Sequence, residues 1–561
     1  MGVFDYRRRK SGAVRVGSTA IGGDNPVRLQ SMTNTSTMDT PASVAQCERI
    51  AAAGADIVRL TAQGVREAEN IGRIRTELRS RGVDVPLVAD IHFNPKAAFE
   101  AARQVEKVRI NPGNFVDPGR TFRKISYTDE EYAAELQRID DALTPFLELC
   151  RENGTAIRIG VNHGSLSDRI MSRFGDTPAG MVESAMEFLR VCRKRDFNEV
   201  VISIKASNVR VMVETVRRLV AAMDAEDMHY PLHLGVTEAG DGEDGRVKSA
   251  VGICTLLAEG IGDTIRVSLS EDPEHEVPVA KFLADYVGSW SGAPEIKGEF
   301  AEGYNPLDPQ RRQSAAVGIV GGDNQPVVVG MDSSEHYDSG SKPDFFADSW
   351  FDFVEIDAQF SDEQLKNIPA DKVVVIKSSH PNYQAAVSAA VHRMITLGIK
   401  NPVVLKVEYC AIAPDEVALR AAVDLGVPLM NGLADGLWID ADTVGAADAS
   451  RIAFGILQSA RMRITRTEYI ACPGCGRTLF DLQTTLRRIK EATAGLRGLK
   501  IGVMGCIVNG PGEMADADYG YVGAGVGKVS LYKGRECVEK NIPAEEAVER
   551  LLDFIERDSR Q

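Results

Sequence analysis

Eight strand–helix pairs follow one another between Val27 and about Gly288, and this rhythm constrains the fold more than any other feature of the sequence. Each pair joins a short run rich in β-branched residues to a stretch with helical periodicity. Parallel strands that are connected by helices close into a barrel when there are eight of them. We therefore predict an α/β chain that begins with a TIM barrel over residues 1–288. The expected strands start at Val27, Asp56, Pro86, Lys107, Ala156, Val200, Leu232 and Asp263.

Three further segments follow the predicted barrel in a chain of 561 residues, which is long enough for several cores. Residues 289–311 are rich in Gly, Pro and acidic residues without a period, which predicts a linker. Residues 312–463 return to the strand–helix rhythm but offer only about five strands. Residues 464–561 hold a cysteine pair, two helical stretches and a Gly-rich loop, which predicts a small α+β domain.

The middle segment repeats short pieces of the first one. GGDNP at 22–26 recurs as GGDNQP at 321–326, IKAS at 204–207 recurs as IKSS at 376–379, and GIGDTIRVS from residue 260 aligns with GLADGLWID from residue 432. Three matches in the same order favour an internal duplication over generic strand–helix similarity. We predict a degenerate barrel-like domain. In this alignment Glu355 corresponds to Arg59 and Trp438 to Arg266, so we expect a structural spacer without a ligand.

Charge and hydropathy exclude some functions. The formal net charge of -15 argues against a general nucleic-acid binder, because affinity for a phosphate backbone needs a basic face. No uncharged run is long enough to span a membrane, and Met1 to Lys10 lacks the apolar core of a secretory signal. We therefore expect a cytoplasmic protein. The basic run from Arg7 to Lys10 is one candidate for docking an acidic protein, and a solvated tail is the alternative.

Five strands of the predicted barrel carry a positive charge where apolar residues are the rule. An unpaired buried charge costs several kcal/mol, so these charges need partners. Internal carboxylates are the structural alternative, and Asp90 and Glu238 could pair with two of the cations. The excess predicts a pocket for a polyanion such as a diphosphate at the carboxyl ends of the strands. The cations are Arg59, Arg109, Arg158, Lys205 and Arg266, and the further donors near them are Asn111, Asn162, Ser207 and Ser268.

Three cysteines near the carboxyl end need their own explanation. CPGC at 472–475 fits a redox dithiol, half of a zinc site or part of an iron–sulfur site. Zinc is disfavoured because no histidine follows His392, and a dithiol leaves Cys506 unexplained. Glu513 follows Cys506 in the Gly-rich loop NGPGE; it is a candidate fourth ligand, with a surface carboxylate as the alternative.

Taken together, these motifs resemble the 4-hydroxy-3-methylbut-2-enyl diphosphate synthase family of the non-mevalonate isoprenoid (MEP) pathway. The resemblance covers about the first 285 residues and the last hundred, and the middle segment is similar to the three-domain form. The motifs are GGDNPVRLQSMTNT, VADIHF, KVRINPGN, RIGVNHGSL, SIKASN, LHLGVTEAGDG, EGIGDTIRVSL, CPGCGR and MGCIVNGPGE.

The resemblance implies an iron–sulfur oxidoreductase that opens the ring of 2-C-methyl-D-erythritol 2,4-cyclodiphosphate. It implies one 4Fe-4S cluster held by Cys472, Cys475, Cys506 and Glu513, and ferredoxin or flavodoxin as the electron donor. Asp90 and the five barrel cations would bind the substrate. Glu238 would be the general acid, with His92 as a second candidate. A homodimer is expected to be possible.

Two other functions remain open at this point. A corrinoid- or pterin-linked barrel methyltransferase shares the predicted fold but gives no role to the three cysteines and Glu513. An electron carrier fused to an anion-binding barrel would pass electrons onward without consuming the cyclodiphosphate.

Overall fold

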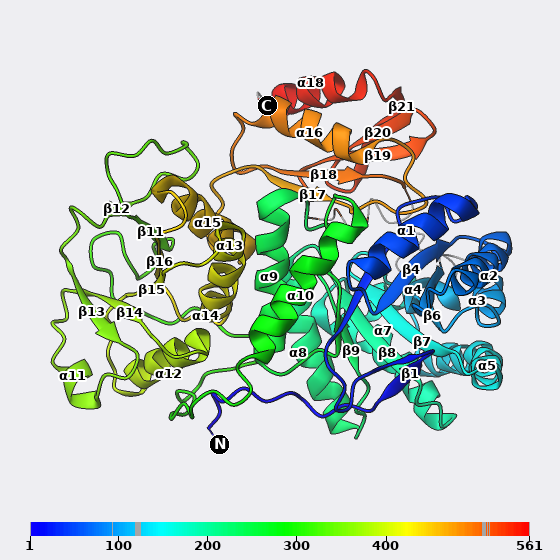
Figure 1. Ribbon diagram of the computed structural model, residues 1–561, viewed down its shortest axis with the longest axis horizontal. Coiled ribbons are helices and arrows are strands. Elements are labelled where there is room, and N and C mark those ends of the chain that lie inside the picture. Colours follow the sequence, from blue (N-terminus) through cyan, green and yellow to red (C-terminus); the bar gives the residue numbers. More distant parts are fainter. Residues whose placement is uncertain are drawn as a thin grey trace. The chain divides into compact units, whose positions relative to one another are not determined.

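The computed structural model describes residues 2–91, 94–117, 125–507, 512, 514 and 516–559 (Figure 1). The chain divides into two compact units, which are described separately. One unit comprises Arg9–Gly242, Ile261–Phe282 and Thr467–Gln561, and the other comprises Met1–Arg8, Glu243–Gly260 and Leu283–Arg466. Among the described helices, none is long and apolar enough to cross a membrane.

Eight parallel strands of the first unit close into a barrel, which confirms the predicted fold. The barrel closes where Thr264 pairs with Arg28. Around the barrel the strands are, in spatial order, β10 (Thr264–Ile265), β3 (Arg28–Met32), β4 (Ile57–Ala62), β5 (Leu87–Ile91), β6 (Lys107–Ile110), β7 (Ala156–Asn162), β8 (Val200–Lys205) and β9 (Leu232–Leu234).

Helices connect the barrel strands, and their ends follow local sequence signals. Thr128 and Glu131 form a reciprocal capping box, and Gly154 with a φ of 64° ends the same helix. The connecting helices are α1 (Thr40–Ala52), α2 (Val65–Ser80), α3 (Pro95–Ala101), α4 (Pro112–Phe115), α5 (Asp129–Asn153), α6 (Asp168–Phe174), α7 (Pro178–Lys194), α8 (Val209–Ala225), α9 (Gly242–Ala258), η1 (Pro273–His275) and α10 (Glu276–Gly288).

A hairpin closes the amino-terminal end of the barrel. Its strands are β1 (Val14–Val16) and β2 (Thr19–Ile21), which pair antiparallel. Their buried apolar side chains pack against Ile57, Val88, Ala156 and Val201, which lie on the barrel strands. The described opening of the barrel is therefore at the carboxyl ends of the strands, where the fold places functional groups.

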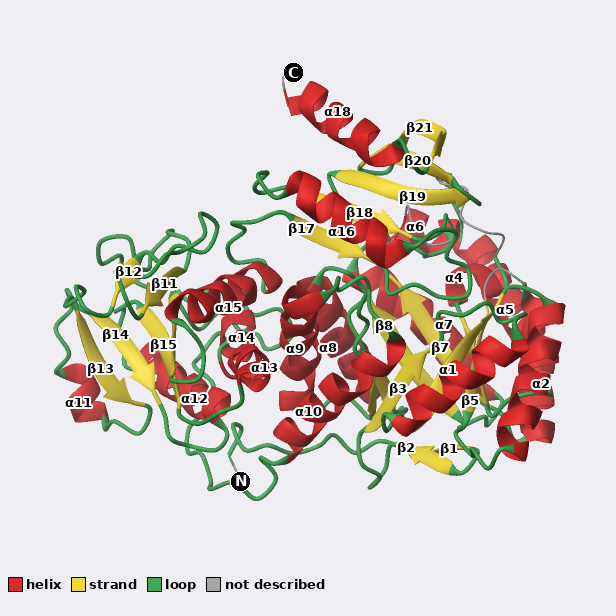
Figure 2. Ribbon diagram, turned by 45° about the horizontal axis from the view of Figure 1, so that its top comes forward, coloured by secondary structure: helices red, strands yellow, loops and turns green. Residues whose placement is uncertain are grey.

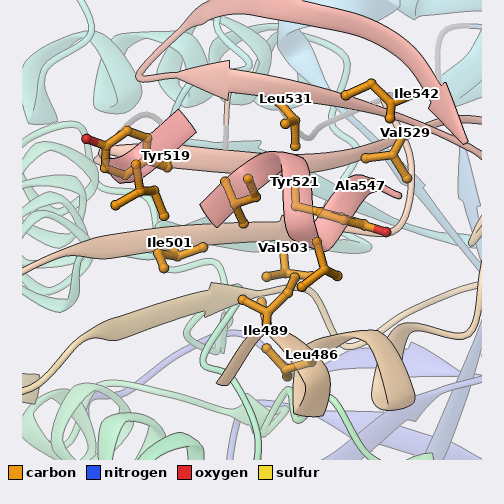
Figure 3. Packing of buried hydrophobic residues seen from close by; sticks show 14 of the residues in the cluster. Leu486, Ile489, Ile501, Val503, Tyr519, Tyr521, Val529, Leu531, Ile542 and Ala547 are labelled. Carbon is orange, nitrogen blue, oxygen red and sulfur yellow. The ribbon is translucent and has the colours of Figure 1, made fainter. Parts of the chain in front are cut away.

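The carboxyl-terminal part of the same unit is a five-stranded sheet, and the described residues there include the helices α16 and α18 (Figure 2). Apolar residues of both helices and of one sheet face form its core, and Figure 3 shows Leu486 and Ile489 among Ile501, Val503 and Tyr521. This is the expected α+β arrangement. The elements are β17 (Glu468–Ala471), α16 (Leu482–Thr493), β18 (Lys500–Met504), β19 (Tyr519–Gly525), β20 (Lys528–Lys533), β21 (Glu536–Pro543) and α18 (Ala547–Ser559).

The second unit contains an open, parallel, six-stranded sheet in place of a closed barrel. The strand missed by the sequence pattern is β12, which has only two residues. In spatial order the strands are β12 (Phe345–Phe346), β11 (Val327–Gly330), β16 (Gly436–Ala441), β15 (Val403–Tyr409), β14 (Val373–Lys377) and β13 (Phe353–Asp357). The helices are α11 (Asp362–Lys366), α12 (Tyr383–Thr396), α13 (Pro414–Asp424), α14 (Gly426–Met430) and α15 (Ala446–Ser459).

The two units repeat the same hydrogen bonds at equivalent places, which supports the duplication. Ser11 Oγ donates to Asp263 Oδ1 at 2.8 Å in the first unit, and Ser314 Oγ donates to Asp435 Oδ1 at 3.1 Å in the second. In each case a glycine N–H of the GGDN turn donates to the serine, and the aspartate accepts from a strand N–H. A generic strand–helix similarity does not explain a shared polar network of this kind.

Strand order corrects one predicted correspondence. The IKAS and IKSS matches align β14 with β8, and β13 pairs with β14 as β7 pairs with β8. The strand of Glu355 therefore corresponds to β7, so its alignment with Arg59 of β4 was wrong. The register of β16 supports the correspondence of Trp438 with Arg266.

The segment 289–311 has no helix or strand, yet it packs against its own unit. Ile296 and Ala301 are buried, and the ring of Phe300 contacts those of Phe4 and His392. The predicted domain boundaries stay a proposal.

Candidate active site

A cavity of about 90 Å³ in the first unit is lined by both the barrel and the cysteine-containing domain. It brings together twelve residues that the sequence singled out: Arg59, Asp90, Arg109, Arg158, Asn162, Lys205, Glu238, Arg266, Ser268, Cys472, Cys475 and Cys506. The lining also includes residues that sequence reasoning missed: Met32, Thr237, Pro473, Gly474, Arg477, Thr478, Met504 and Gly505.

Two described site residues, Asn111 and Ser207, are not among those lining the cavity. Asn111 is buried and caps α4, because its Oδ1 accepts from the N–H of Gly113 at 3.0 Å. Ser207 is buried, follows β8 by two residues and is not among the residues that line the cavity. His92 and Glu513 lie outside the described residues.

Asp90 pairs with two of the five predicted cations. Its Oδ1 lies 3.1 Å from Arg109 Nη1, and its Oδ2 lies 3.7 Å from Arg59 Nε. Arg109 also donates to Asn162 Oδ1 at 3.0 Å, so this guanidinium is fixed from two sides. Asp90 is therefore an internal partner of two barrel cations, as the structural alternative to an anion pocket predicted.

Arg266 pairs with Glu276, an acid that the strand pattern does not indicate. Both guanidinium nitrogens Nε and Nη2 donate to Glu276, at 3.0 and 2.9 Å, and Ser31 Oγ donates to the same carboxylate at 2.8 Å. Glu276 begins α10 and is itself buried. The signal that could have revealed it is its position at the start of α10, the helix that follows β10 and Arg266.

Three buried basic side chains of the barrel have nitrogen atoms without hydrogen-bond partners among the described residues. The amine of Lys107, Nε and Nη1 of Arg158 and both ring nitrogens of His233 have no hydrogen-bond partner among the described residues. Burial lowers the pKa of Lys107 well below its usual value, and the charge of Arg158 lowers it further. Burial also lowers the pKa of His233, and Arg158 again adds to the effect. The charge of Arg158, which lines the cavity, therefore favours a negatively charged ligand there.

Lys205 shows the same excess of positive charge at the cavity itself. Burial lowers its pKa, the charges of Arg59 and Arg266 lower it further, and Glu238 opposes them. Glu238 is 5% exposed and has a φ of 51°, an uncommon conformation for a residue with a side chain. Such conformations persist where the surrounding structure enforces them.

The three cysteines lie around one side of the same cavity. The N–H of Gly505 donates to Cys472 Sγ at 3.2 Å, and Ser270 Oγ donates to the carbonyl of Cys472 at 2.8 Å. Among the described residues, no three His, Cys, Asp or Glu side chains are arranged to hold a single metal ion. A four-iron cluster holds its ligands farther apart than one ion does, and thiolates are its usual ligands. The donor set therefore fits an iron–sulfur cluster.

Comparisons with known proteins agree with this arrangement. The TIM-barrel domain of the GcpE family matches residues 11–281, and the C-terminal domain of the same family matches residues 468–557. A protein of Bacteroides thetaiotaomicron named 4-hydroxy-3-methylbut-2-en-1-yl diphosphate synthase (flavodoxin) is 54% identical over 611 residues, covering 100% of both chains.

Two further relatives carry the same name. The protein of Akkermansia muciniphila is 46% identical over 98% of this chain and 97% of its own. The protein of Leptospira interrogans is 41% identical over 98% of this chain and 97% of its own. Among solved structures, the dihydropteroate synthase of Yersinia pestis matches 50% of this chain and 99% of its own, at 13% identity and a TM-score of 0.33, which is too low to bear on function.

Proposed function

We propose, from the premise that the chain belongs to the family of 4-hydroxy-3-methylbut-2-en-1-yl diphosphate synthases, that the cavity is where the substrate ring is opened. The reaction of the family is a reductive ring opening in the non-mevalonate isoprenoid pathway. It converts 2-C-methyl-D-erythritol 2,4-cyclodiphosphate to (E)-4-hydroxy-3-methylbut-2-enyl diphosphate and water with two electrons. The observation that carries the proposal is one cavity lined by both the barrel cations and the three cysteines.

The barrel residues bind the diphosphate in this proposal. Arg158 and Lys205 are buried and line the cavity, and guanidinium and ammonium groups form charge-assisted hydrogen bonds with phosphate oxygens. Arg59, Arg109 and Arg266 supply further charge, although their carboxylate partners fix their positions. Asn162 and Ser268 lie where they can donate to the same ligand.

Cys472, Cys475 and Cys506 would hold one 4Fe-4S cluster per chain. Glu513 stays the proposed fourth ligand and lies outside the described residues. When bound, the cluster would supply the two electrons of the reduction. The chain's own residues would hold the substrate beside it.

Glu238 is the proposed general acid, because it lines the cavity from the segment that follows β9. The substrate loses a hydroxyl group, which needs a proton to depart as water. His92 stays the second candidate and lies outside the described residues. A Glu238→Gln variant that keeps full turnover would remove Glu238 from this role.

Flavodoxin is the proposed electron donor, since the relatives' names print it, with ferredoxin as the alternative. The cytoplasmic location and a homodimer stay predictions. Arg9 in the predicted basic run pairs with Asp224 at 2.9 Å, so this run is not wholly a solvated tail.

The test begins with anaerobically purified protein. We expect a broad absorption band at about 400 nm, about four irons per chain, and consumption of the cyclodiphosphate with dithionite and a mediator. A Cys506→Ser variant should lose turnover. Zinc in place of iron would contradict the proposal. An iron protein that leaves the cyclodiphosphate intact would favour an electron carrier or a methyltransferase.

A further inference from the structure

Arg477 is a cation of the cavity that comes from the cysteine-containing domain and not from the barrel. It lies two residues after Cys475, in the loop between β17 and α16, and it lines the cavity. Arg59 and Asp90 line it too, and both interact electrostatically with Arg477. The guanidinium therefore faces the barrel cations across the same space.

Close backbone contacts fix the loop that carries Arg477. A Cβ at Gly476 would lie 2.8 Å from both Thr35 O and Thr61 Oγ1, so only glycine fits against these barrel residues. The N–H of Cys475 donates to Thr478 Oγ1 at 3.0 Å. Gly476 and Thr478 flank Arg477 in the sequence, so the direction of its side chain follows from both contacts.

The guanidinium keeps donors that the protein does not use. Nε and Nη1 of Arg477 are buried and have no hydrogen-bond partner among the described residues, while a further donor bonds to the thiol of Cys475. Asp90, the nearby acid, is already engaged with Arg59 and Arg109. Buried guanidinium donors without hydrogen bonds are costly, so the arrangement favours a ligand that accepts hydrogen bonds from them.

We propose that Arg477 binds a phosphate group of the ligand and thereby couples ligand binding to the contact between the cysteine-containing domain and the barrel. This inference rests on the proposed function, because it takes the ligand to be the cyclic diphosphate. A planar guanidinium suits two phosphate oxygens at once, which a lysine ammonium does not reproduce. A ligand held from both sides stabilises the state in which the two parts are together.

The alternative is that Arg477 serves only the cysteines, through its bond to Cys475. The two roles differ in what a substitution changes. A role confined to the cysteine loop predicts altered iron content or an altered visible spectrum with unchanged ligand binding. The proposed role predicts weaker ligand binding with unchanged iron content.

The experiment measures binding of inorganic pyrophosphate and of the cyclodiphosphate to the anaerobic, iron-loaded full chain by calorimetry. Arg477→Gln should weaken both affinities by on the order of 10- to 100-fold. Arg477→Lys should restore part of the loss and also serves if the first variant does not fold. Arg487→Gln is the control, because Arg487 is an exposed residue of α16 in the same domain. It should change affinity by less than about twofold.

Hydrogen exchange reports the coupling. Ala471 ends β17 and forms a bridge to Ala239, which follows β9 of the barrel, so the amides of Glu468–Ala471 report the contact. The ligand should protect these amides in the parent protein and in the control, and should not protect them in Arg477→Gln. Normal affinity and normal protection in Arg477→Gln would overturn the inference.

Failure of the proposed function would look different. Suppose that the parent protein binds pyrophosphate, that Arg477→Gln binds it weakly, and that the cyclodiphosphate is never consumed. Then Arg477 binds an anion as inferred, and the proposed reaction is wrong. If the cyclodiphosphate is consumed and Arg477→Gln binds it normally, only the inference fails. If the parent protein binds neither ligand, both fail.

Discussion

Ala239 and Ala471 form an isolated parallel β-bridge that connects the barrel to the cysteine-containing domain. Ala239 follows Glu238, the proposed acid, and Ala471 precedes Cys472, a proposed cluster ligand. Ser270 Oγ strengthens the junction by donating to the carbonyl of Cys472. The bridge thus fixes Glu238, the proposed proton donor, relative to Cys472, a proposed ligand of the electron-supplying cluster.

Gly164 lies at a close backbone contact between the barrel and the cysteine-containing domain. A Cβ at this position would lie 2.2 Å from the carbonyl oxygen of Gly512. We expect Gly164→Ala to lower turnover by on the order of 100-fold, because a small displacement of the reacting groups is enough to cost that much. Cyclodiphosphate consumption with dithionite measures it.

Gly154→Ala is the matched control for this substitution. Gly154 also has a positive φ, of 64°, but a Cβ there would meet nothing within 4 Å. It should cost about 1 kcal/mol of stability and leave turnover near the parent value. Equal turnover in the two variants would contradict the proposed role of the Gly164 contact.

Glu276→Gln should destabilise the protein strongly. The substitution leaves Arg266 buried without its carboxylate, which costs about 3–5 kcal/mol. Glu274→Gln removes a pair with the half-exposed Arg49 and should cost less than about 1 kcal/mol. Urea unfolding of both variants measures the difference, and similar losses would show that the Arg266–Glu276 pair contributes no more than a surface pair.

Lys107→Met should stabilise the protein at pH 7. The folded-state pKa of Lys107 is lowered, so the unfolded chain takes up a proton that the native amine does not hold, and stability falls as the pH drops below about 10.4. Methionine removes this penalty with similar volume, for a gain of about 1–4 kcal/mol. The gain should shrink when urea unfolding is repeated above pH 10. Destabilisation at pH 7 would mean that Lys107 makes a favourable native interaction.

Asp424 gives stability a dependence on pH in the second unit. Burial raises its pKa to about 6, although Tyr409 and Tyr286 lower it by donating to the carboxylate at 2.7 and 2.9 Å. Its contribution is fully present below about pH 4 and is lost as the pH rises through about 6. The loss is about 3 kcal/mol at 1.36 kcal/mol per pKa unit.

The matching variant is Asp424→Asn, which has no charge to bury. Its stability relative to the parent should rise between pH 4 and pH 7 by about this amount, measured by urea unfolding in both proteins. A constant difference across that range would show that Asp424 keeps an ordinary pKa.

Strand periodicity located most of the candidate site in advance. Arg158 and Lys205 were recognisable because a charged residue interrupts an apolar strand, and the barrel closure brings both to one cavity. Asn111 does not line the cavity, because its short side chain after a strand caps the helix that follows; its predicted role in substrate binding stays a prediction. Glu276 and Arg477 were missed because neither lies on a strand.

The sequence by itself determined the elements, the closure of eight strands into a barrel and the grouping of three cysteines, because these follow from short-range periodicity and motif spacing. Only the tertiary structure decided which basic group has a partner, since Arg266 meets Glu276 while the Lys107 amine has none within the described part of the chain. It also decided that the second sheet stays open and that Arg477 reaches the cavity of the barrel. The physical reason is that pairing and burial are set by contacts between distant segments, which local patterns do not specify.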